Sequence, residues 1–227
     1  MTLIVADGTQ MNAYAVRPAA APEKGIIVLQ EAFGVNDYVK RIAQRFAEQG
    51  YLAIAPELFH RTAPGFDADY VKKEGVMEQM GALTDDGLAN DMKAVFDWLV
   101  AQGIPKDKIA VIGFCMGGRA AYLANAMLPV AASVSFYGGG IAPTLLVRAG
   151  KLHGPQLLIW GGKDAHIPPE QTQAVADALT AAGKSFVERT FPEGGHGFAC
   201  DARDSYHEPS ARAAWALTDE FLKNNIE

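Results

Sequence analysis

Residues 109–120 read IAVIGFCMGGRA and place Cys115 between two glycines in the pattern G-x-C-x-G. An apolar run precedes the cysteine and a small-residue helix start follows it, which is the form of a nucleophile elbow with cysteine in the serine position. Gly113 and Gly117, two positions to either side, allow such a sharp turn to close. The turn sets the thiol at a helix N-terminus, which stabilises a thiolate and presents the Met116 N–H to a developing oxyanion.

A cysteine nucleophile needs a base, and the base needs a group that orients it. Asp164 follows the apolar run LLIW in a turn that contains two glycines, and His196 lies between Gly195 and Gly197 after another strand-like run. Loops at strand ends carry the catalytic groups of parallel sheets. The order Cys115, Asp164, His196 after three different strands therefore predicts a catalytic triad.

Each of these residues also has a structural explanation. Free cysteine is among the most buried residue types, so Cys115 is alternatively a core residue at a tight turn. Asp164 is alternatively a turn residue or a helix cap, and His196 a loop histidine without a task. Their joint occurrence in this order favours catalysis. The other histidines are expected to be solvent-facing or loop residues without zinc-ligand spacing beside a carboxylate: His60, His153, His166 and His207.

The pattern of apolar residues predicts the elements that position this triad. Asp7-Gly8 predicts a hairpin turn near the start of the chain. Strands are expected at 25–29, 51–55, 108–113, 130–137, 157–160 and 185–191, and helices at 38–48, 88–100, 117–126, 170–182 and 211–223. This alternation implies right-handed crossovers and a mainly parallel sheet with helices on both faces. The segments 57–69 and 138–155 are expected to be long loops or excursions and are candidate pocket walls.

Composition excludes several classes of protein. The 227 residues are 49% hydrophobic and 20% charged, which suits one globular domain over residues 1–227. The net charge of −6 leaves no basic surface for nucleic acid. No segment has the pattern of a signal peptide or a membrane span, so a cytoplasmic protein is expected. Two cysteines are too few for a disulfide framework or a zinc site.

Four segments of the chain resemble the dienelactone hydrolase family, also called carboxymethylenebutenolidase. They are residues 30–36 (QEAFGVN), 113–118 (GFCMGG), 161–164 (GGKD) and 195–198 (GHGF). The resemblance covers nearly the whole chain, and a cysteine elbow with a preceding E-x-F-G motif is characteristic of this family rather than of serine esterases. It implies the α/β-hydrolase fold.

The resemblance also implies roles for individual residues. Cys115, Asp164 and His196 form its triad, and the backbone N–H groups of Ala32 and Met116 form its oxyanion hole. Family members use a glutamate at the position of Glu31, which interacts with the resting thiol and takes part in generating the thiolate. Tyr137 resembles the family's pocket tyrosine and is expected to contact substrate.

The residue Glu31 has a physical interpretation of its own. A carboxylate at the end of a buried strand accepts a thiol proton if burial raises its pKa, whereas the alternative is an acid in a surface loop. The chain departs from the family at the arginines that hold the carboxylate of dienelactone. Cys200 occupies the position four residues after His196, and the nearest arginine is Arg203. Neither family arginine is assigned, although Arg61, Lys72 and Lys73 occur in the variable region.

These observations predict cysteine-dependent hydrolysis of a small ester or lactone through an acyl-thioester, without a metal or an organic cofactor. One alternative is a broad-specificity carboxylesterase or thioesterase. Another is a protein that binds a ligand without turnover, or a thiol redox sensor that uses Cys115 and Cys200. The expected partner is a small-molecule substrate, with neither nucleic acid nor membrane, and the chain is expected to be a monomer or a small homo-oligomer.

Overall fold

An eight-stranded sheet forms the centre of the computed structural model, which describes residues 1–226. The strands are β1 (Thr2–Ile4), β2 (Gln10–Val16), β3 (Lys24–Leu29), β4 (Tyr51–Pro56), β5 (Ile109–Phe114), β6 (Ala132–Phe136), β7 (Gln156–Gly161) and β8 (Phe186–Phe191). Their order in the sheet is β1-β2-β4-β3-β5-β6-β7-β8. The strands from β3 to β8 are parallel, and only β1 and β2 pair antiparallel to their neighbours. The predicted mainly parallel sheet is confirmed.

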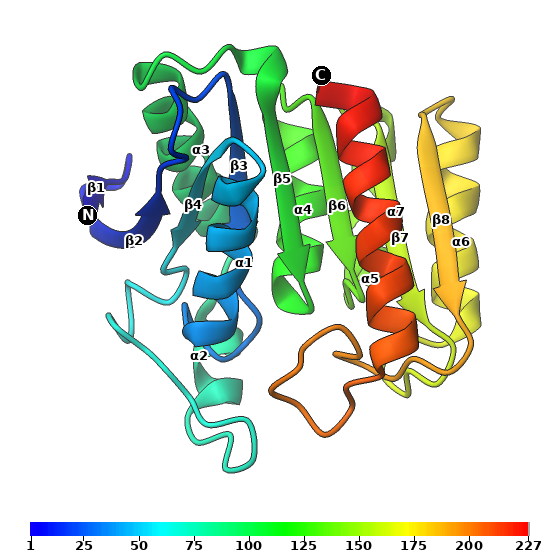
Figure 1. Cartoon of the computed structure of the whole chain (residues 1–227). Coiled ribbons are helices and arrows are strands. Elements are labelled where there is room, and N and C mark those ends of the chain that lie inside the picture. The colour runs from blue at the N-terminus through cyan, green and yellow to red at the C-terminus, as the bar shows by residue number, and fades with distance from the viewer. Residues whose placement is uncertain (227) are drawn as a thin grey trace.

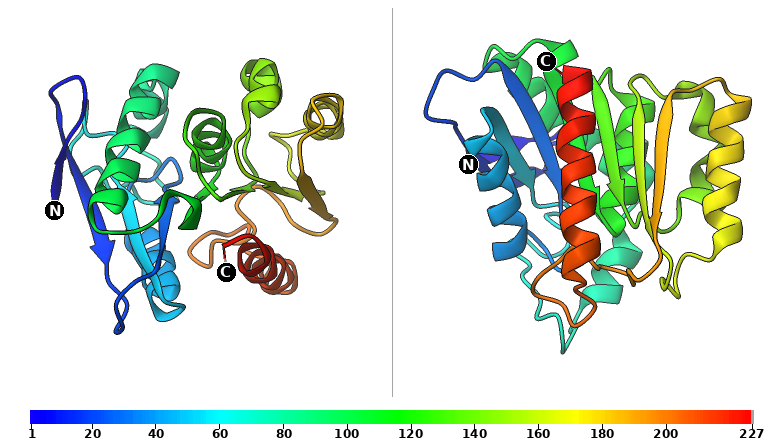
Figure 2. Two further views of the ribbon diagram at one scale, coloured as in Figure 1. Left: turned by 90° about the horizontal axis from the view of Figure 1, so that it is seen from above. Right: turned by 45° about the vertical axis from the view of Figure 1, so that its right-hand side comes forward.

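Helices cover both faces of this sheet. They are α1 (Asp37–Glu48), α2 (Val76–Ala82), α3 (Asp85–Ala101), α4 (Met116–Met127), α5 (Ile141–Leu145), α6 (Pro169–Ala181) and α7 (Glu208–Ile226), with the 3₁₀ segments Lys106–Lys108 and Leu146–Lys151. Figure 2 shows α1 and α7 against one face and α3, α4 and α6 against the other. The arrangement is the α/β-hydrolase fold.

Burial explains why the central strands read as continuous apolar runs. Every residue of β4, β5 and β7 is buried, as expected for strands covered on both faces. Helix α1 instead buries one stripe, including Val39, Ile42 and Phe46. Its N-cap Asn36 accepts a hydrogen bond from the Val39 N–H at 3.3 Å, which fixes where the helix begins.

One expectation about loops needs correction. The segment 138–155 is not a continuous loop, because Ile141–Leu145 and Leu146–Lys151 are short helical segments. Pro143 and Gly150 interrupt the apolar pattern there, so no helical period is visible in the sequence. Helix α2 was not predicted either. It has seven residues, of which only Val76 and Gln79 are buried, too few to show a periodic apolar face.

The carboxyl ends of the parallel strands meet at the edge of the sheet that faces down in Figure 1. Helix α2 and the loop 192–207 lie at this edge. The chain runs from β3 to β4 on one side and continues through β5 on the other, so the strand order reverses between β3 and β5. Such a reversal is where ligands bind in open α/β sheets. Within residues 1–226, none of the helices combines the length and the apolar character that a membrane span requires.

Candidate active site

Cys115 occupies a strained turn between β5 and α4. Its backbone angles are φ 56° and ψ −119°, a conformation that residues with a side chain rarely adopt. A Cβ atom at Gly113 would collide with the carbonyl group of Gly117, and one at Gly117 would collide with the carbonyl oxygens of Leu29 and Gln30. The glycines of the elbow are therefore required by close backbone approach, as the sequence predicts.

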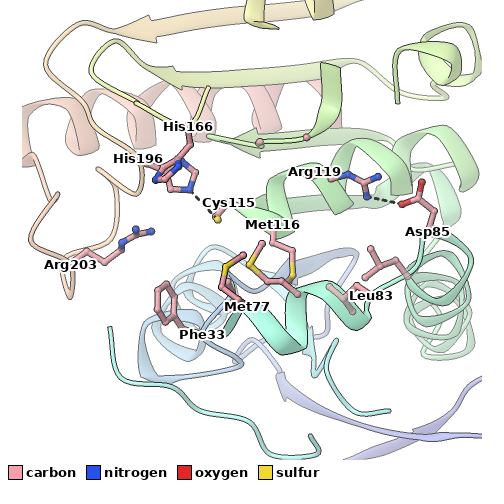
Figure 3. Close-up of a pocket in the computed structure, with 15 residues that line it drawn as sticks. Phe33, Met77, Leu83, Asp85, Cys115, Met116, Arg119, His166, His196 and Arg203 are labelled. Carbon is pink, nitrogen blue, oxygen red and sulfur yellow. Dashed lines mark hydrogen bonds and ion pairs between the residues drawn. The ribbon is translucent and has the colours of Figure 1, made fainter. Parts of the chain in front are cut away.

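The three residues predicted as a triad are in hydrogen-bond contact. His196 Nε2 lies 3.1 Å from Cys115 Sγ, and His196 Nδ1 lies 2.8 Å from Asp164 Oδ2. The second oxygen of Asp164 accepts the backbone N–H of His166 at 2.8 Å, and Ser205 Oγ donates to the His196 carbonyl at 2.7 Å. Figure 3 shows the His196 ring directed at the thiol. These bonds hold the imidazole in the orientation that a general base requires.

Charge favours the protonated imidazole in this arrangement. Burial by itself lowers the pKa of His196, but the hydrogen bonds and charges of Asp164 and Cys115 outweigh burial and raise the pKa of His196 to about 10. Burial by itself raises the pKa of Asp164, but the hydrogen bond to His196 outweighs burial and lowers the pKa of Asp164 below its ordinary value. The Asp164 carboxylate therefore stays charged and stabilises the imidazolium.

Tyr137 does not line the pocket, contrary to the expectation that it contacts substrate. The residue is fully buried, with φ 38°. Its ring packs edge-on against His196, with ring centroids 5.3 Å apart, and against Phe198 at 5.6 Å. Tyr137 follows β6 directly, so the sequence places it correctly at the site edge but does not reveal that its side chain turns inward. Its ring supports the His196 ring through this edge contact.

Glu31 is buried beside the site and pairs with an arginine. Only 1% of its side chain is exposed, and its Oε1 accepts a hydrogen bond from Arg203 Nη1 at 3.2 Å. Burial raises the pKa of Glu31, and the Arg203 charge partly offsets that effect. The resemblance predicts contact between Glu31 and the resting thiol. In this structure Cys115 Sγ is instead bonded to His196, and the hydrogen bonds of the described residues include none between Glu31 and Cys115.

Arg203 is a site residue that sequence reasoning did not assign. It lines the pocket, and its guanidinium lies over the Phe33 ring at 5.5 Å. The arginine reaches the site because Gly197, at φ 84°, has no Cβ to meet the guanidinium. Arg203 does not stand four residues after His196, the spacing of the family arginine. The signals for it in the sequence were its positive charge close to His196 and the glycine at position 197. Arg61, by contrast, pairs with Asp91 and Asp7 outside the pocket.

Replacement of Arg203 by alanine is expected to destabilise the protein more at pH 8 than at pH 5. Loss of the cation raises the pKa of Glu31 further above its unfolded value. The folded state then retains a proton that the unfolded state releases, so stability falls as pH rises above about 4.5. We expect a loss of about 3 kcal/mol at pH 8, measured by urea unfolding. The double variant with Glu31→Gln should lose the pH dependence. An equal loss at both pH values would instead indicate packing on Phe33 alone.

The pocket above Cys115 has a volume of about 580 Å³, within the range of small-molecule sites. Its lining residues are Ala32, Phe33, Met77, Met80, Leu83, Asp85, Leu88, Cys115, Met116, Arg119, Gly139, Gly140, His166, His196 and Arg203. Ala32 and Met116, predicted to form the oxyanion hole, are both present. The segment 138–155 contributes Gly139 and Gly140 as expected, whereas the segment 57–69 contributes no lining residue. The pocket wall expected from the segment 57–69 is formed instead by α2 and the start of α3.

Three further sequence expectations concern histidine, cysteine and metal. His60 lies in a loop as expected, but it is buried and its Nε2 lies 3.1 Å from Asp91 Oδ1. His166 is exposed and lines the pocket, with its ring 5.0 Å from that of His196.

Cys200 is buried, and burial raises its pKa to about 12. Residues 1–226 contain no group of three His, Cys, Asp or Glu side chains arranged to hold a metal ion.

Known proteins resemble this chain over nearly its full length. The profile of the dienelactone hydrolase family matches residues 11–226. A protein of Yersinia pestis with the provisional name carboxymethylenebutenolidase is 35% identical, over 99% of this chain and 88% of its own. A protein of Synechocystis sp. with the same provisional name is 31% identical, over 96% of this chain and 93% of its own.

A solved structure agrees with these sequence relatives. The crystal structure of a provisionally named dienelactone hydrolase from Klebsiella pneumoniae superposes with a TM-score of 0.88 at 32% identity, and the match covers 98% of this chain and 96% of the other. Together with the match of the family profile, this likeness shows that the chain belongs to the dienelactone hydrolase family of ester-bond hydrolases.

Proposed function

We propose that this hydrolase cleaves a small ester or lactone with Cys115 as its nucleophile and an acyl-thioester as its intermediate. The observation that carries the proposal is the continuous line of contacts from Cys115 Sγ through His196 to Asp164, at 3.1 and 2.8 Å, on a strained elbow. The provisional names of the relatives, carboxymethylenebutenolidase, favour a lactone among the esters.

At the start of acylation the thiol proton of Cys115 lies on His196 Nε2, as the raised pKa of His196 favours. The thiolate then attacks the substrate carbonyl carbon, and the carbonyl oxygen takes up negative charge. The N–H groups of Ala32 and Met116 are the donors to this oxyanion, since Met116 is the first residue of α4 and its N–H lacks an intrahelical acceptor. Collapse of the adduct breaks the bond to the alkoxide, which takes the proton from His196, and leaves the acyl group on sulfur.

Deacylation requires His196 in its neutral form. The thioester sulfur carries no charge, so the part of the raised pKa that is due to Cys115 disappears in the acyl-enzyme, and the pKa of His196 falls from about 10. Neutral His196 then takes a proton from water while the water oxygen attacks the thioester carbon. The thiolate leaves, and the carboxylic acid is released.

An intact-mass measurement during turnover tests the proposal. The protein is mixed with an excess of an activated ester and quenched with acid within the first turnovers. We expect the mass of one acyl group on the intact protein and, after digestion, on the peptide that contains Cys115. The acylated fraction should increase as the pH falls below the pKa of His196 in the acyl-enzyme, because protonated His196 cannot activate water. Equal acylation of a Cys115→Ala variant would contradict the assignment of the nucleophile.

A further inference from the structure

The pocket has two chemically different sides. His166, His196 and Arg203 lie on one side of Cys115, where Phe33 packs beneath Arg203. Met77, Met116 and Leu83 lie on the other side (Figure 3). We name the apolar side the methionine groove and define it by Met77, Met80, Leu83, Leu88 and Met116. Arg119 and Asp85 also line the pocket and are joined by an ion pair of 2.7 Å.

The geometry of attack assigns substrate groups to the two sides. The carbon attacked by Cys115 becomes tetrahedral, with bonds to sulfur, the oxyanion, the leaving oxygen and the acyl carbon. The oxyanion points to the Met116 N–H, and the leaving oxygen must face His196, which gives it a proton. The acyl carbon takes the remaining direction, away from the histidine. Figure 3 shows Met77, Met116 and Leu83 on the side of Cys115 away from His196, so the acyl group extends toward the methionine groove.

We propose, on the basis of the proposed function, that this enzyme selects esters with an apolar acyl group of several carbons and that the methionine groove binds this group. The leaving alcohol then lies on the side of His166 and Arg203. Leu88 and Met116 are buried at the groove, Met80 is half-buried, and Met77 is 77% exposed at its mouth. An acyl chain covers these side chains and removes apolar surface from water, which favours longer chains.

Two features of the groove define the range of acyl groups. Methionine side chains are unbranched and flexible, so three of them adapt to linear and to branched chains. The ion pair of Arg119 with Asp85 sets an outer limit, and Arg119 also donates to Thr144 Oγ1 at 2.8 Å. Because both charges are already partnered, a methyl group that reaches them gains no contact that replaces their hydration.

A series of esters with one alcohol and acyl groups of increasing length tests the inference. With 4-nitrophenyl acetate, butyrate, hexanoate and octanoate, kcat/KM is expected to rise about tenfold from acetate to butyrate, as burial of two methylenes implies. The rise should stop where the chain meets the Arg119 and Asp85 pair. A constant kcat/KM across the series would overturn the inference. A preference set by the alcohol at constant acyl length would overturn the assignment of the two sides.

Substitutions in the groove separate binding from folding. Met80→Gln, which is nearly isosteric, is expected to reduce the butyrate-to-acetate ratio of kcat/KM about fivefold, and Met77→Glu should reduce it without unfolding an exposed site. The matched control is Met127→Gln, since Met127 lies at the end of α4 outside the pocket and is 43% exposed. The control should keep the ratio and the rates of the unchanged enzyme. Unaltered ratios in both groove variants would contradict the inference.

The two proposals fail in different ways. If Cys115→Ala retains hydrolysis of every ester, the proposed nucleophile is wrong, whatever the chain-length preference. If Cys115→Ala is inactive and the unchanged enzyme shows no preference for longer acyl groups, the nucleophile stands and the role of the methionine groove is wrong. The covalent mass on Cys115 adds a third readout, since a mixture of acetyl and hexanoyl esters should give mainly the hexanoyl-enzyme.

Discussion

Replacement of Cys115 by alanine is expected to reduce kcat for ester hydrolysis by about a millionfold, the scale seen when a triad loses its nucleophile. No other thiol substitutes for it, because Cys200 is buried and burial raises its pKa to about 12. Steady-state kinetics with an activated ester measures the loss. Thermal unfolding should show a folded protein, because the substitution removes only the Sγ atom. The close backbone approach at Gly113 and Gly117 is unchanged.

The serine variant separates the nucleophile from its surroundings. Cys115→Ser preserves the elbow and the hydrogen bond to His196, but a serine hydroxyl must lose its proton as it attacks. We expect kcat to fall about 10²- to 10⁴-fold, the range over which proton transfer in the transition state contributes. Cys200→Ser is the matched control, and it should leave kcat within about twofold. Full activity of Cys115→Ser would contradict the proposal that the nucleophile acts as a thiolate.

The sequence predicts the triad because chain order and strand ends are local features. Each of Cys115, Asp164 and His196 follows an apolar strand and is accompanied by glycines, and parallel strands deliver such residues to one edge. Their contacts then follow from the sheet order, which places β5, β7 and β8 on the same side of the reversal after β3. The strained backbone at Cys115 is also predictable, because the G-x-C-x-G pattern has a steric reason.

The walls of the pocket were not predictable in the same way. Helix α2 contributes Met77 and Met80 to the methionine groove, yet its seven residues carry no periodic signal. Its position depends on packing against the loop after β3. Arg203 enters the site from a loop whose course is set by Gly197 and by hydrogen bonds such as that of Ser205 with the His196 carbonyl. Tyr137 shows the same limit, because a strand end fixes where a residue lies but not which way its side chain turns.

Asp164→Asn is expected to lower kcat about 10⁴-fold while KM changes little, the effect known for loss of the orienting carboxylate in a triad. Asp164 Oδ2 accepts a hydrogen bond from His196 Nδ1, which directs Nε2 at Cys115 Sγ, where it holds the thiol proton. An asparagine amide donates to Nδ1 instead and moves the imidazole proton to Nε2, the wrong nitrogen for a base. The backbone bond from His166 keeps the side chain in place, so the loop should retain its fold.

The free energy of unfolding provides an independent test of the contact between Asp164 and His196. The pKa of His196 is raised to about 10, so the proton on His196 stabilises the folded state fully below its ordinary pKa of 6.5, and this contribution is lost as pH rises through about 10. The lowered pKa of Asp164 adds stability that is present above its ordinary value of 3.8. The free energy of unfolding should therefore differ most between the unchanged protein and Asp164→Asn from about pH 4 to 6.5, and the difference should shrink toward pH 10. Urea unfolding across this range measures it. A difference that does not vary with pH would show that Asp164 acts through packing, and the 10⁴-fold loss of kcat would then need another cause.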